Sequence, residues 1–214
     1  MMTLLTIFFT SFMLALSGAM MPGPLLTATI SESARRGFVA GPLLILGHGL
    51  LEFALVILLL LGLAPLLSHS EVFIGIALAG AGILAWLGIG MLRSLPTLKL
   101  SWQAADQGSG AGNLVAAGVL LSLANPYWTV WWVTIGLGSI LSCLEIGPLG
   151  VAFFFAGHIS ADLAWYALVS AAVGRGRALL TDRLYRGIIG VCGVFLLGFA
   201  VYFLYAGLRA WEVF

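Results

Sequence analysis

With 214 residues, of which 62% are hydrophobic and only 8% charged, this chain cannot be an ordinary soluble domain, in which about a quarter of the residues are charged. The mean hydropathy of +1.14 instead predicts an integral membrane protein whose first partner is the lipid bilayer. The net charge of +1 says nothing about nucleic acid, but the sequence contains no basic patch with interleaved aromatic residues, so nucleic acid is not an expected partner.

Six long apolar segments predict an all-α protein with six transmembrane helices, because each segment approaches the roughly 20 residues that cross a bilayer. In chain order the segments are Leu4–Ile30, Val39–Leu67, Val72–Leu92, Leu114–Leu141, Gly147–Val173 and Gly187–Trp211. A polar linker at about residues 95–111 divides the single transmembrane domain, 1–214, into a first repeat of about 1–94 and a second of about 112–214.

The basic residues alternate between the loops. Eight of the nine follow spans one, three and five: Arg35, Arg36, Arg93, Lys99, Arg175, Arg177, Arg183 and Arg186. Cytoplasmic loops carry the excess of lysine and arginine, so we expect these loops in the cytoplasm and both termini outside. With three spans per half, the halves then enter the membrane from opposite sides. This predicts a 3+3 inverted-topology repeat of the kind that secondary transporters use.

One short phrase occurs twice with identical spacing. The phrase covers Gly47–Ala54 and again Gly157–Ala164. It reads glycine, histidine, any three residues, an acid, any residue and alanine. Its ionisable members are His48, Glu52, His158 and Asp162. A histidine and an acid four residues apart lie on one face of a helix, and each costs about 2.5–3.5 kcal/mol at the centre of a span on insertion scales. We interpret the four as substrate-binding or proton-coupling residues; the alternative is two structural pairs, each within its own helix.

Each half opens with a span that proline interrupts. Pro22, Gly23 and Pro24 lie in span one, and Asn125 and Pro126 lie in span four. Proline donates no backbone hydrogen bond and cannot continue a regular helix, so we expect a broken helix at both places. The N–H groups at the start of each second half-helix would then point toward the midplane, where they suit an anionic group.

Aromatic residues follow the second break. Tyr127 and Trp128 are possible walls of a substrate pocket, with packing as the equal alternative, whereas we interpret Trp131 and Trp132 as packing residues.

The motifs S-G-A-M-M-P-G-P-L-L and E-S-A-R-R-G-F-V-A-G-P, together with N-P-Y-W at the start of the second half, resemble the LysE family of amino-acid exporters. The resemblance covers nearly the whole chain in length and span layout. It implies a bacterial inner-membrane carrier that expels an amino acid such as lysine, arginine, threonine or homoserine. It assigns Pro22, Gly23, Pro24, Asn125 and Pro126 to the helix breaks of the family.

Together these features favour proton-coupled export of an amino acid or a related small metabolite, without a cofactor. Histidine exchanges protons near neutral pH, so a histidine–acid pair can carry the coupling proton while a carboxylate receives an ammonium group. The alternative is a divalent transition-metal carrier with His48, Glu52, His158 and Asp162 as ligands. An enzyme is not expected, because G-x-S-x-G, H-E-x-x-H and C-x-x-C motifs do not occur. Small-residue faces permit a homodimer.

Overall fold

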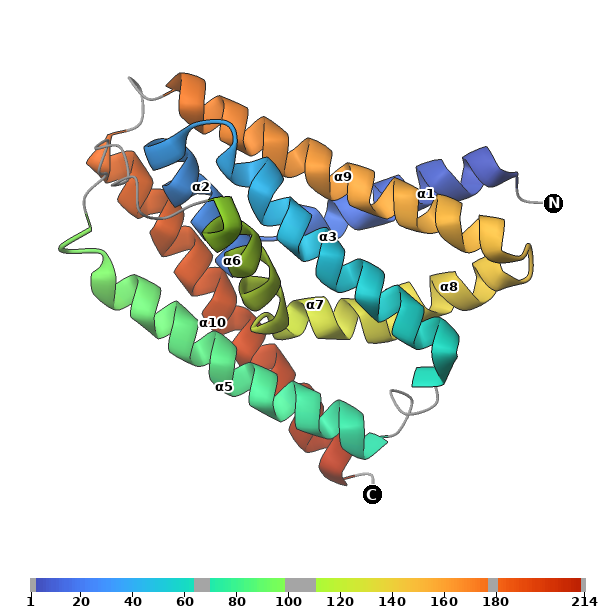
Figure 1. Ribbon diagram of the computed structural model, residues 1–214. Coiled ribbons are helices and arrows are strands. Elements are labelled where there is room, and N and C mark those ends of the chain that lie inside the picture. The colour runs from blue at the N-terminus through green and yellow to red at the C-terminus, as the bar shows by residue number, and fades with distance from the viewer. Residues whose placement is uncertain (1–2, 64–69, 99–110, 177–180, 213–214) are drawn as a thin grey trace.

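The computed structural model describes residues 3–63, 70–98, 111–176 and 181–212, and every regular element in these ranges is a helix (Figure 1). The elements are α1 (Leu4–Ala19), α2 (Pro24–Arg36), α3 (Ala40–Leu58), η1 (Leu59–Leu63), α5 (Ser70–Ser94), α6 (Ala111–Leu123), α7 (Pro126–Trp131), η2 (Trp132–Gly136), α8 (Leu137–Leu144), α9 (Pro148–Arg175) and α10 (Asp182–Glu212). Most of the predicted linker, residues 99–110, lies outside the described ranges.

Four helical stretches are long and apolar enough to cross a membrane: Ala40–Gly62, Ile74–Ser94, Pro148–Arg175 and Asp182–Trp211. The bent pair α1 and α2 makes a fifth if it is counted as one span. These stretches agree with predicted spans one, two, three, five and six. The region predicted as span four, Leu114–Leu141, differs, because it consists of α6, α7, η2 and α8, the longest of which has 13 residues. The all-helical membrane protein is confirmed, whereas the count of six spans stays a prediction.

The chain bends by 79° between α1 and α2, at the first predicted proline break. Pro24 begins α2, where a missing N–H is tolerated because the first helical N–H groups have no partner within the helix. Gly23 precedes it as the capping residue and, having no side chain, forms no side-chain cap. Among the described residues, no side chain therefore caps the first N–H groups of α2.

At the second break, between α6 and α7, a side chain caps the helix that follows. The side-chain Oδ1 of Asn125 accepts a hydrogen bond from the backbone N–H of Tyr127 at 3.2 Å. Pro126 begins α7, which passes after six residues into the π-helical turn η2. Such turns are frequent at functional sites. The start of α7 thus has its own cap, unlike the start of α2.

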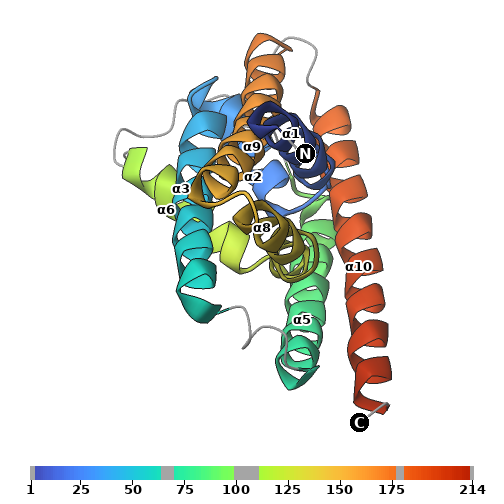
Figure 2. The same cartoon turned by 90° about the vertical axis from the view of Figure 1, so that its right-hand side faces the viewer.

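Helices from the two halves pack in matching pairs: α3 against α6, α9 against α1, and α5 against α10 (Figures 1 and 2). Gly47 of α3 faces the backbone carbonyl of Val115 in α6. Gly157 of α9 faces the carbonyl of Phe8 in α1 in the same manner. A Cβ atom at either glycine would overlap that carbonyl oxygen. The glycines of the repeated phrase therefore permit the close helix approach that small residues provide in membranes.

Side chains are distributed as expected for a bundle surrounded by lipid. Buried polar and charged side chains are Ser11, Thr29, Ser33, His48, Glu52, Ser122, His158, Asp162 and Ser170. Large apolar side chains point outward, among them Phe9, Trp86, Leu168 and Val201, each more than 60% exposed. An extensive exposed apolar surface marks a membrane contact in a protein of this composition.

We predict that Gly47→Ala and Gly157→Ala each lower the melting temperature of the detergent-purified protein, because the added methyl group forces α3 from α6 or α9 from α1. Overpacking of this kind costs about 1–3 kcal/mol. Gly82→Ala is the matched control, since nothing lies within 4 Å of a Cβ atom added there. A thermal-shift series checks this, and equal melting of all three variants would contradict the packing.

Candidate functional site

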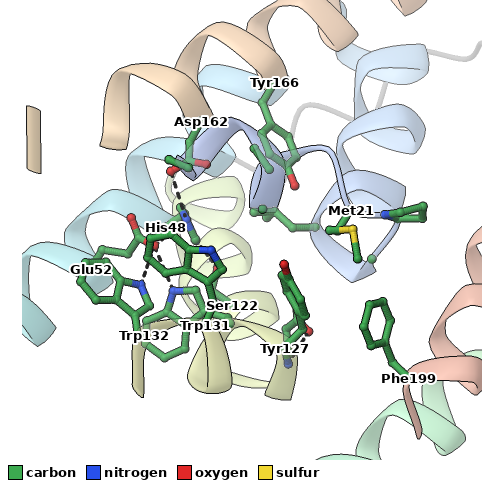
Figure 3. A pocket seen from close by; sticks show the side chains of 18 of the residues that line it. Met21, His48, Glu52, Ser122, Tyr127, Trp131, Trp132, Asp162, Tyr166 and Phe199 are labelled. Carbon is green, nitrogen blue, oxygen red and sulfur yellow. Dashed lines mark hydrogen bonds and ion pairs between the residues drawn. The ribbon is translucent and has the colours of Figure 1, made fainter. Parts of the chain in front are cut away.

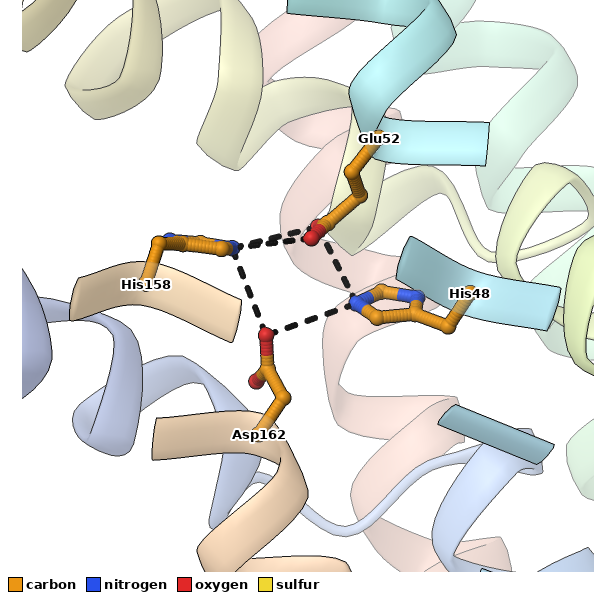
Figure 4. A group of neighbouring side chains, drawn as sticks. All are labelled: His48, Glu52, His158 and Asp162. Carbon is orange, nitrogen blue, oxygen red and sulfur yellow. Dashed lines mark hydrogen bonds and ion pairs between the residues drawn. The ribbon is translucent and has the colours of Figure 1, made fainter. Parts of the chain in front are cut away.

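Four buried side chains from two helices meet at one point inside the bundle (Figure 4). They are His48 and Glu52 of α3 and His158 and Asp162 of α9. One nitrogen or oxygen atom from each lies within 4.8 Å of the others, and their exposed fractions are 8%, 1%, 4% and 4% in that order. The structure therefore brings together all four ionisable residues of the repeated phrase.

Each imidazole lies between the two carboxylates. Nε2 of His48 is 3.0 Å from Oε1 of Glu52 and 3.7 Å from Oδ2 of Asp162. Nε2 of His158 is 3.1 Å from Oε2 of Glu52 and 3.4 Å from Oδ2 of Asp162. The four groups form one network across α3 and α9, rather than two separate pairs within single helices.

Glu52 is held by hydrogen-bond donors from beyond the second helix break. Nε1 of Trp128 donates to Oε1 of Glu52 at 3.0 Å, and Nε1 of Trp132 donates to the same oxygen at 2.9 Å. Nε2 of His158 lies 3.2 Å from that oxygen as well. Several N–H groups aimed at one carboxylate fix its orientation. Glu52 thus links α3 to α7 and η2.

The orientation of His48 is set by a serine of α6. Oγ of Ser122 lies 2.7 Å from Nδ1 of His48 and donates to the backbone carbonyl of Gly118 at 2.7 Å. A hydroxyl has one hydrogen to donate, so Oγ accepts from His48, and we assign a proton to Nδ1. Nε2 of His48, which faces both carboxylates, is then the nitrogen that gains or loses a proton.

Asp162 and His158 have fewer partners. Oδ2 of Asp162 is buried and accepts no hydrogen bond of good geometry from the described residues, and the same holds for Oε2 of Glu52. Nδ1 of His158 is likewise buried without a hydrogen-bond partner in that part of the chain. The His158 ring packs instead against the indoles of Trp131 and Trp132, with ring centroids 4.8 and 5.2 Å apart. Asp162 therefore accepts fewer hydrogen bonds than Glu52, whose Oε1 has two indole donors although its Oε2 has none of good geometry among the described residues.

The network forms one side of a cavity that both helix breaks reach (Figure 3). Pro22 and Gly23 line it from the first break, and Asn125 lines it from the second. Pro24 instead lines a neighbouring cavity between α2 and the helices α5, α6 and α10. Pro126 is the first residue of α7. Residues of both predicted breaks therefore surround the same space as the ionisable network.

Aromatic and apolar side chains make up the rest of the wall. Tyr127 and Trp128, the predicted pocket residues, both line the cavity, and so does Tyr166 of α9. Met21 and Phe199 lie on the side away from Glu52 (Figure 3). The cavity consequently has a charged end and an apolar end.

Two partners of the network were not predicted from the sequence. Trp132, interpreted as a packing residue, is buried and also donates to Glu52. Ser122, which was not singled out, holds His48. A signal was present for the tryptophans, because Trp128 and Trp132 are four residues apart, the same spacing as the histidine and acid of α3.

The network also has the donor types of a transition-metal site. Imidazole nitrogen and carboxylate oxygen are common zinc ligands, with bonds of about 2.0–2.2 Å that put tetrahedral ligands about 3.3 Å apart. The four cross-contacts between imidazole and carboxylate, 3.0 to 3.7 Å, bracket that separation. Ser122 and the two indoles would act as the second layer of hydrogen bonds that such ligands have.

Comparison with known proteins gives the family. The model for the LysE type translocator matches residues 16–207. The chemotactic transduction protein ChpE of Pseudomonas aeruginosa is 36% identical over 208 residues, which cover 92% of this chain and 97% of the relative. The putative amino acid efflux protein YcgF of Bacillus subtilis is 29% identical over 212 residues, which cover 96% and 98%.

No solved structure gives a significant match. The family match confirms the resemblance predicted from the proline motifs, and a translocator moves a small molecule rather than converting it. With the model and a relative more than 30% identical both spanning nearly the whole chain, this multi-pass membrane protein belongs to the LysE-type translocator family.

Proposed function

We propose that this protein exports an amino acid across the bacterial inner membrane in exchange for protons. The observation that carries the proposal is the buried network of two imidazoles and two carboxylates at a cavity reached by two helix breaks. Broken helices near the midplane commonly form the substrate sites of secondary transporters. The Bacillus subtilis relative is named a putative amino acid efflux protein, which supports an amino acid as cargo.

Charge balance gives the network a way to couple substrate to protons. Two carboxylates in an apolar interior are disfavoured unless cations compensate them. Without substrate, protons on the two imidazoles supply the positive charge. When substrate binds, its ammonium group replaces one of these protons as a source of positive charge. Imidazole exchanges protons near neutral pH, so proton and substrate alternate in the network as the cavity opens to one side and then to the other.

We infer that the halves form a 3+3 inverted repeat, with α6, α7, η2 and α8 together as the fourth span. The packing of α3 on α6 and of α9 on α1 supports this inference. The repeated glycines make the same contact in each half. Gly47 approaches the carbonyl of Val115, and Gly157 approaches the carbonyl of Phe8.

A second contact recurs three residues away in each half. Gly118 approaches the carbonyl of Leu44, and Oγ of Ser11 donates to the carbonyl of Phe154 at 2.7 Å. Leu44 and Phe154 each stand three residues before the repeated glycine. Gly118 stands three residues after Val115, whose carbonyl Gly47 approaches. In the same way, Ser11 stands three residues after Phe8, whose carbonyl Gly157 approaches. Equivalent positions make equivalent contacts, as a repeat requires.

For the orientation, we predict that both termini lie outside the cytoplasm, because eight of the nine basic residues fall in alternate loops. Alkaline phosphatase fused after Phe214 should be active, and a green fluorescent protein at the same place should be dark. Fusions after Ser94 should give the reverse result. Fluorescence at Phe214 together with phosphatase activity at Ser94 would contradict this topology.

For transport, we predict that Glu52→Gln and Asp162→Asn each abolish amino-acid flux, since each removes one carboxylate from a buried charged network. Breaking such a network also costs about 3–5 kcal/mol of folding stability, so flux is compared only among variants that fold. The measurement is proton flux into liposomes that contain a pH dye, evoked by a panel of amino acids.

Glu145→Gln is the matched control for this experiment, because Glu145 is an exposed acid just after α8 and should transport as the wild type does. Each variant is first checked for a monodisperse elution profile, which separates loss of transport from loss of folding. Wild-type flux from both network variants would refute the role given to the network.

A divalent-metal carrier is the second candidate, because four ligand atoms converge within 4.8 Å. The family match gives it no support. The same liposomes decide between the two: flux evoked by Zn²⁺ or Mn²⁺ but by no amino acid, and lost in His48→Ala, would replace amino-acid export with metal transport.

A further inference from the structure

We propose that the cavity binds a zwitterionic amino acid with an uncharged, apolar side chain in one orientation, its ammonium group at Asp162 and its carboxylate at the N-terminus of α2. The proposal rests on amino-acid export as proposed above, and adds the substrate class and the group that each end contacts. Each half supplies one histidine and one acid to the network. A substrate is therefore bound in a single orientation only if the two carboxylates differ in the hydrogen bonds that they can still accept.

Asp162 has more capacity for an ammonium group than Glu52, although one buried oxygen of each carboxylate lacks a hydrogen bond of good geometry among the described residues. Glu52 accepts from Trp128 and Trp132, and its Oε1 lies within 3.2 Å of Nε2 of both imidazoles. Oδ2 of Asp162 accepts no hydrogen bond of good geometry from the described residues, and its nearer imidazole nitrogen is 3.4 Å away. A buried acceptor without a donor is costly until a ligand supplies one, and an ammonium group brings three N–H donors.

This difference follows from unlike residues at matched positions after the two breaks. Trp128 and Trp132 stand two and six residues after the proline of the second break. The residues at the same distances after Pro24 are Leu26 and Ile30. Both are buried and aliphatic, and their side chains donate no hydrogen bond. Helix α2 therefore cannot hold Asp162 in the way that α7 and η2 hold Glu52.

The two histidines differ for the same reason. Ser122, which accepts from the histidine of α3, stands four residues after Gly118. In the other half, Ser11 is the counterpart of Gly118, and the residue four positions after it is Ala15. Ala15 has no hydroxyl, which agrees with the absence of a hydrogen-bond partner for Nδ1 of His158 among the described residues. The less constrained half of the network is thus the half that contains Asp162.

A substrate carboxylate likewise has one helix N-terminus available. At α7, a helix of six residues, the side chain of Asn125 already accepts from the N–H of Tyr127. At α2, a helix of 13 residues, the capping residue is Gly23 and no side chain caps the helix. Gly23 and Leu25 line the same cavity as Asp162. The uncapped N–H groups and positive dipole end of α2 therefore suit the carboxylate of a ligand whose ammonium group is bound at Asp162.

The remaining wall disfavours a charged substrate side chain. Among the described residues that line the cavity there is no lysine or arginine to pair with an acidic side chain. Its carboxylates are Glu52, whose Oε1 already accepts from two indoles, and Asp162, which is assigned to the ammonium group. Met21, Leu84 and Phe199 offer an apolar surface instead. We therefore expect a neutral substrate of the leucine or methionine type, in contrast to the lysine and arginine that the family resemblance includes.

The first test uses wild-type protein in detergent and measures binding by calorimetry. L-leucine should bind at least roughly tenfold more tightly than leucinamide, which lacks the carboxylate, and than 4-methylpentanoate, which lacks the ammonium group. L-lysine should bind at least roughly tenfold more weakly than L-leucine. Binding of leucinamide, 4-methylpentanoate or L-lysine as tight as that of L-leucine would overturn the proposal, whatever happens to any variant.

The second test asks which carboxylate binds the ammonium group. Asp162→Asn should remove the preference for L-leucine over 4-methylpentanoate, because the ammonium group loses its charged partner. Glu52→Gln should keep that preference in whatever binding it retains, since Glu52 is held by the indoles. The opposite pattern, with the preference lost in Glu52→Gln and kept in Asp162→Asn, would overturn the assignment.

The third test gives α2 the side-chain cap that α7 has. Gly23→Asn should weaken binding of L-leucine and of 4-methylpentanoate at least roughly tenfold and leave leucinamide unaffected, because the new side chain competes for the N–H groups of α2. The backbone at Gly23 is extended, with φ at −155°, and the nearest heavy atom to an added Cβ is 3.7 Å away, so the position accepts a side chain. Gly23→Ala is the matched control, and equal effects of the two substitutions would overturn the carboxylate site.

These outcomes distinguish the inference from the proposed function. If amino acids evoke proton flux in liposomes while Asp162→Asn and Gly23→Asn leave all analogue preferences unchanged, the orientation is wrong and amino-acid export stands. If no amino acid binds the wild type or evokes flux, both proposals fail together.

Discussion

The burial of two carboxylates in an apolar helix bundle is the constraint on which this structure depends. Glu52 and Asp162 are 1% and 4% exposed, so their charge must be compensated inside the protein. The compensation comes from two imidazoles placed between them and from two indole N–H groups on Glu52. No single helix supplies all of these groups. The ionisable network therefore requires α3, α9 and the segment after the second break to meet at one point.

The repeated phrase also contributes to the packing that makes this meeting possible. The glycine of each copy directly precedes its histidine, and it faces a backbone carbonyl of a helix from the other half. A larger residue there would move the helix that carries the histidine, and a shift of 1 Å is large compared with the range of a hydrogen bond. Close packing and network chemistry are therefore specified by neighbouring residues. This is a physical reason for both functions to lie in one short phrase.

The sequence predicted the parts of the site that depend on local spacing, and it missed those that depend on the path of the chain after a break. The histidine–acid pairs follow from the helical period, and both breaks follow from proline. The contact of Trp132 with Glu52 joins residues 80 positions apart and depends on the direction that α7 takes after Asn125. Hydropathy along the chain also indicates one span at 114–141, where the structure has four short elements. A π-helical turn and a capping asparagine leave no signal in apolar periodicity.

For the exchange of substrate and proton that we propose, matched backbone contacts with unmatched side chains are better suited than full symmetry would be. If indoles held both carboxylates as they hold Glu52, one oxygen of each would already have two donors, and a substrate cation would gain less by entering. If no indole held either carboxylate, the two imidazoles alone would compensate both, and the empty state would be less favourable. One fixed anion and one accessible anion avoid both extremes. In the binding site that we propose, Leu26 and Ile30, which stand where the other half has its two tryptophans, account for this difference between the carboxylates.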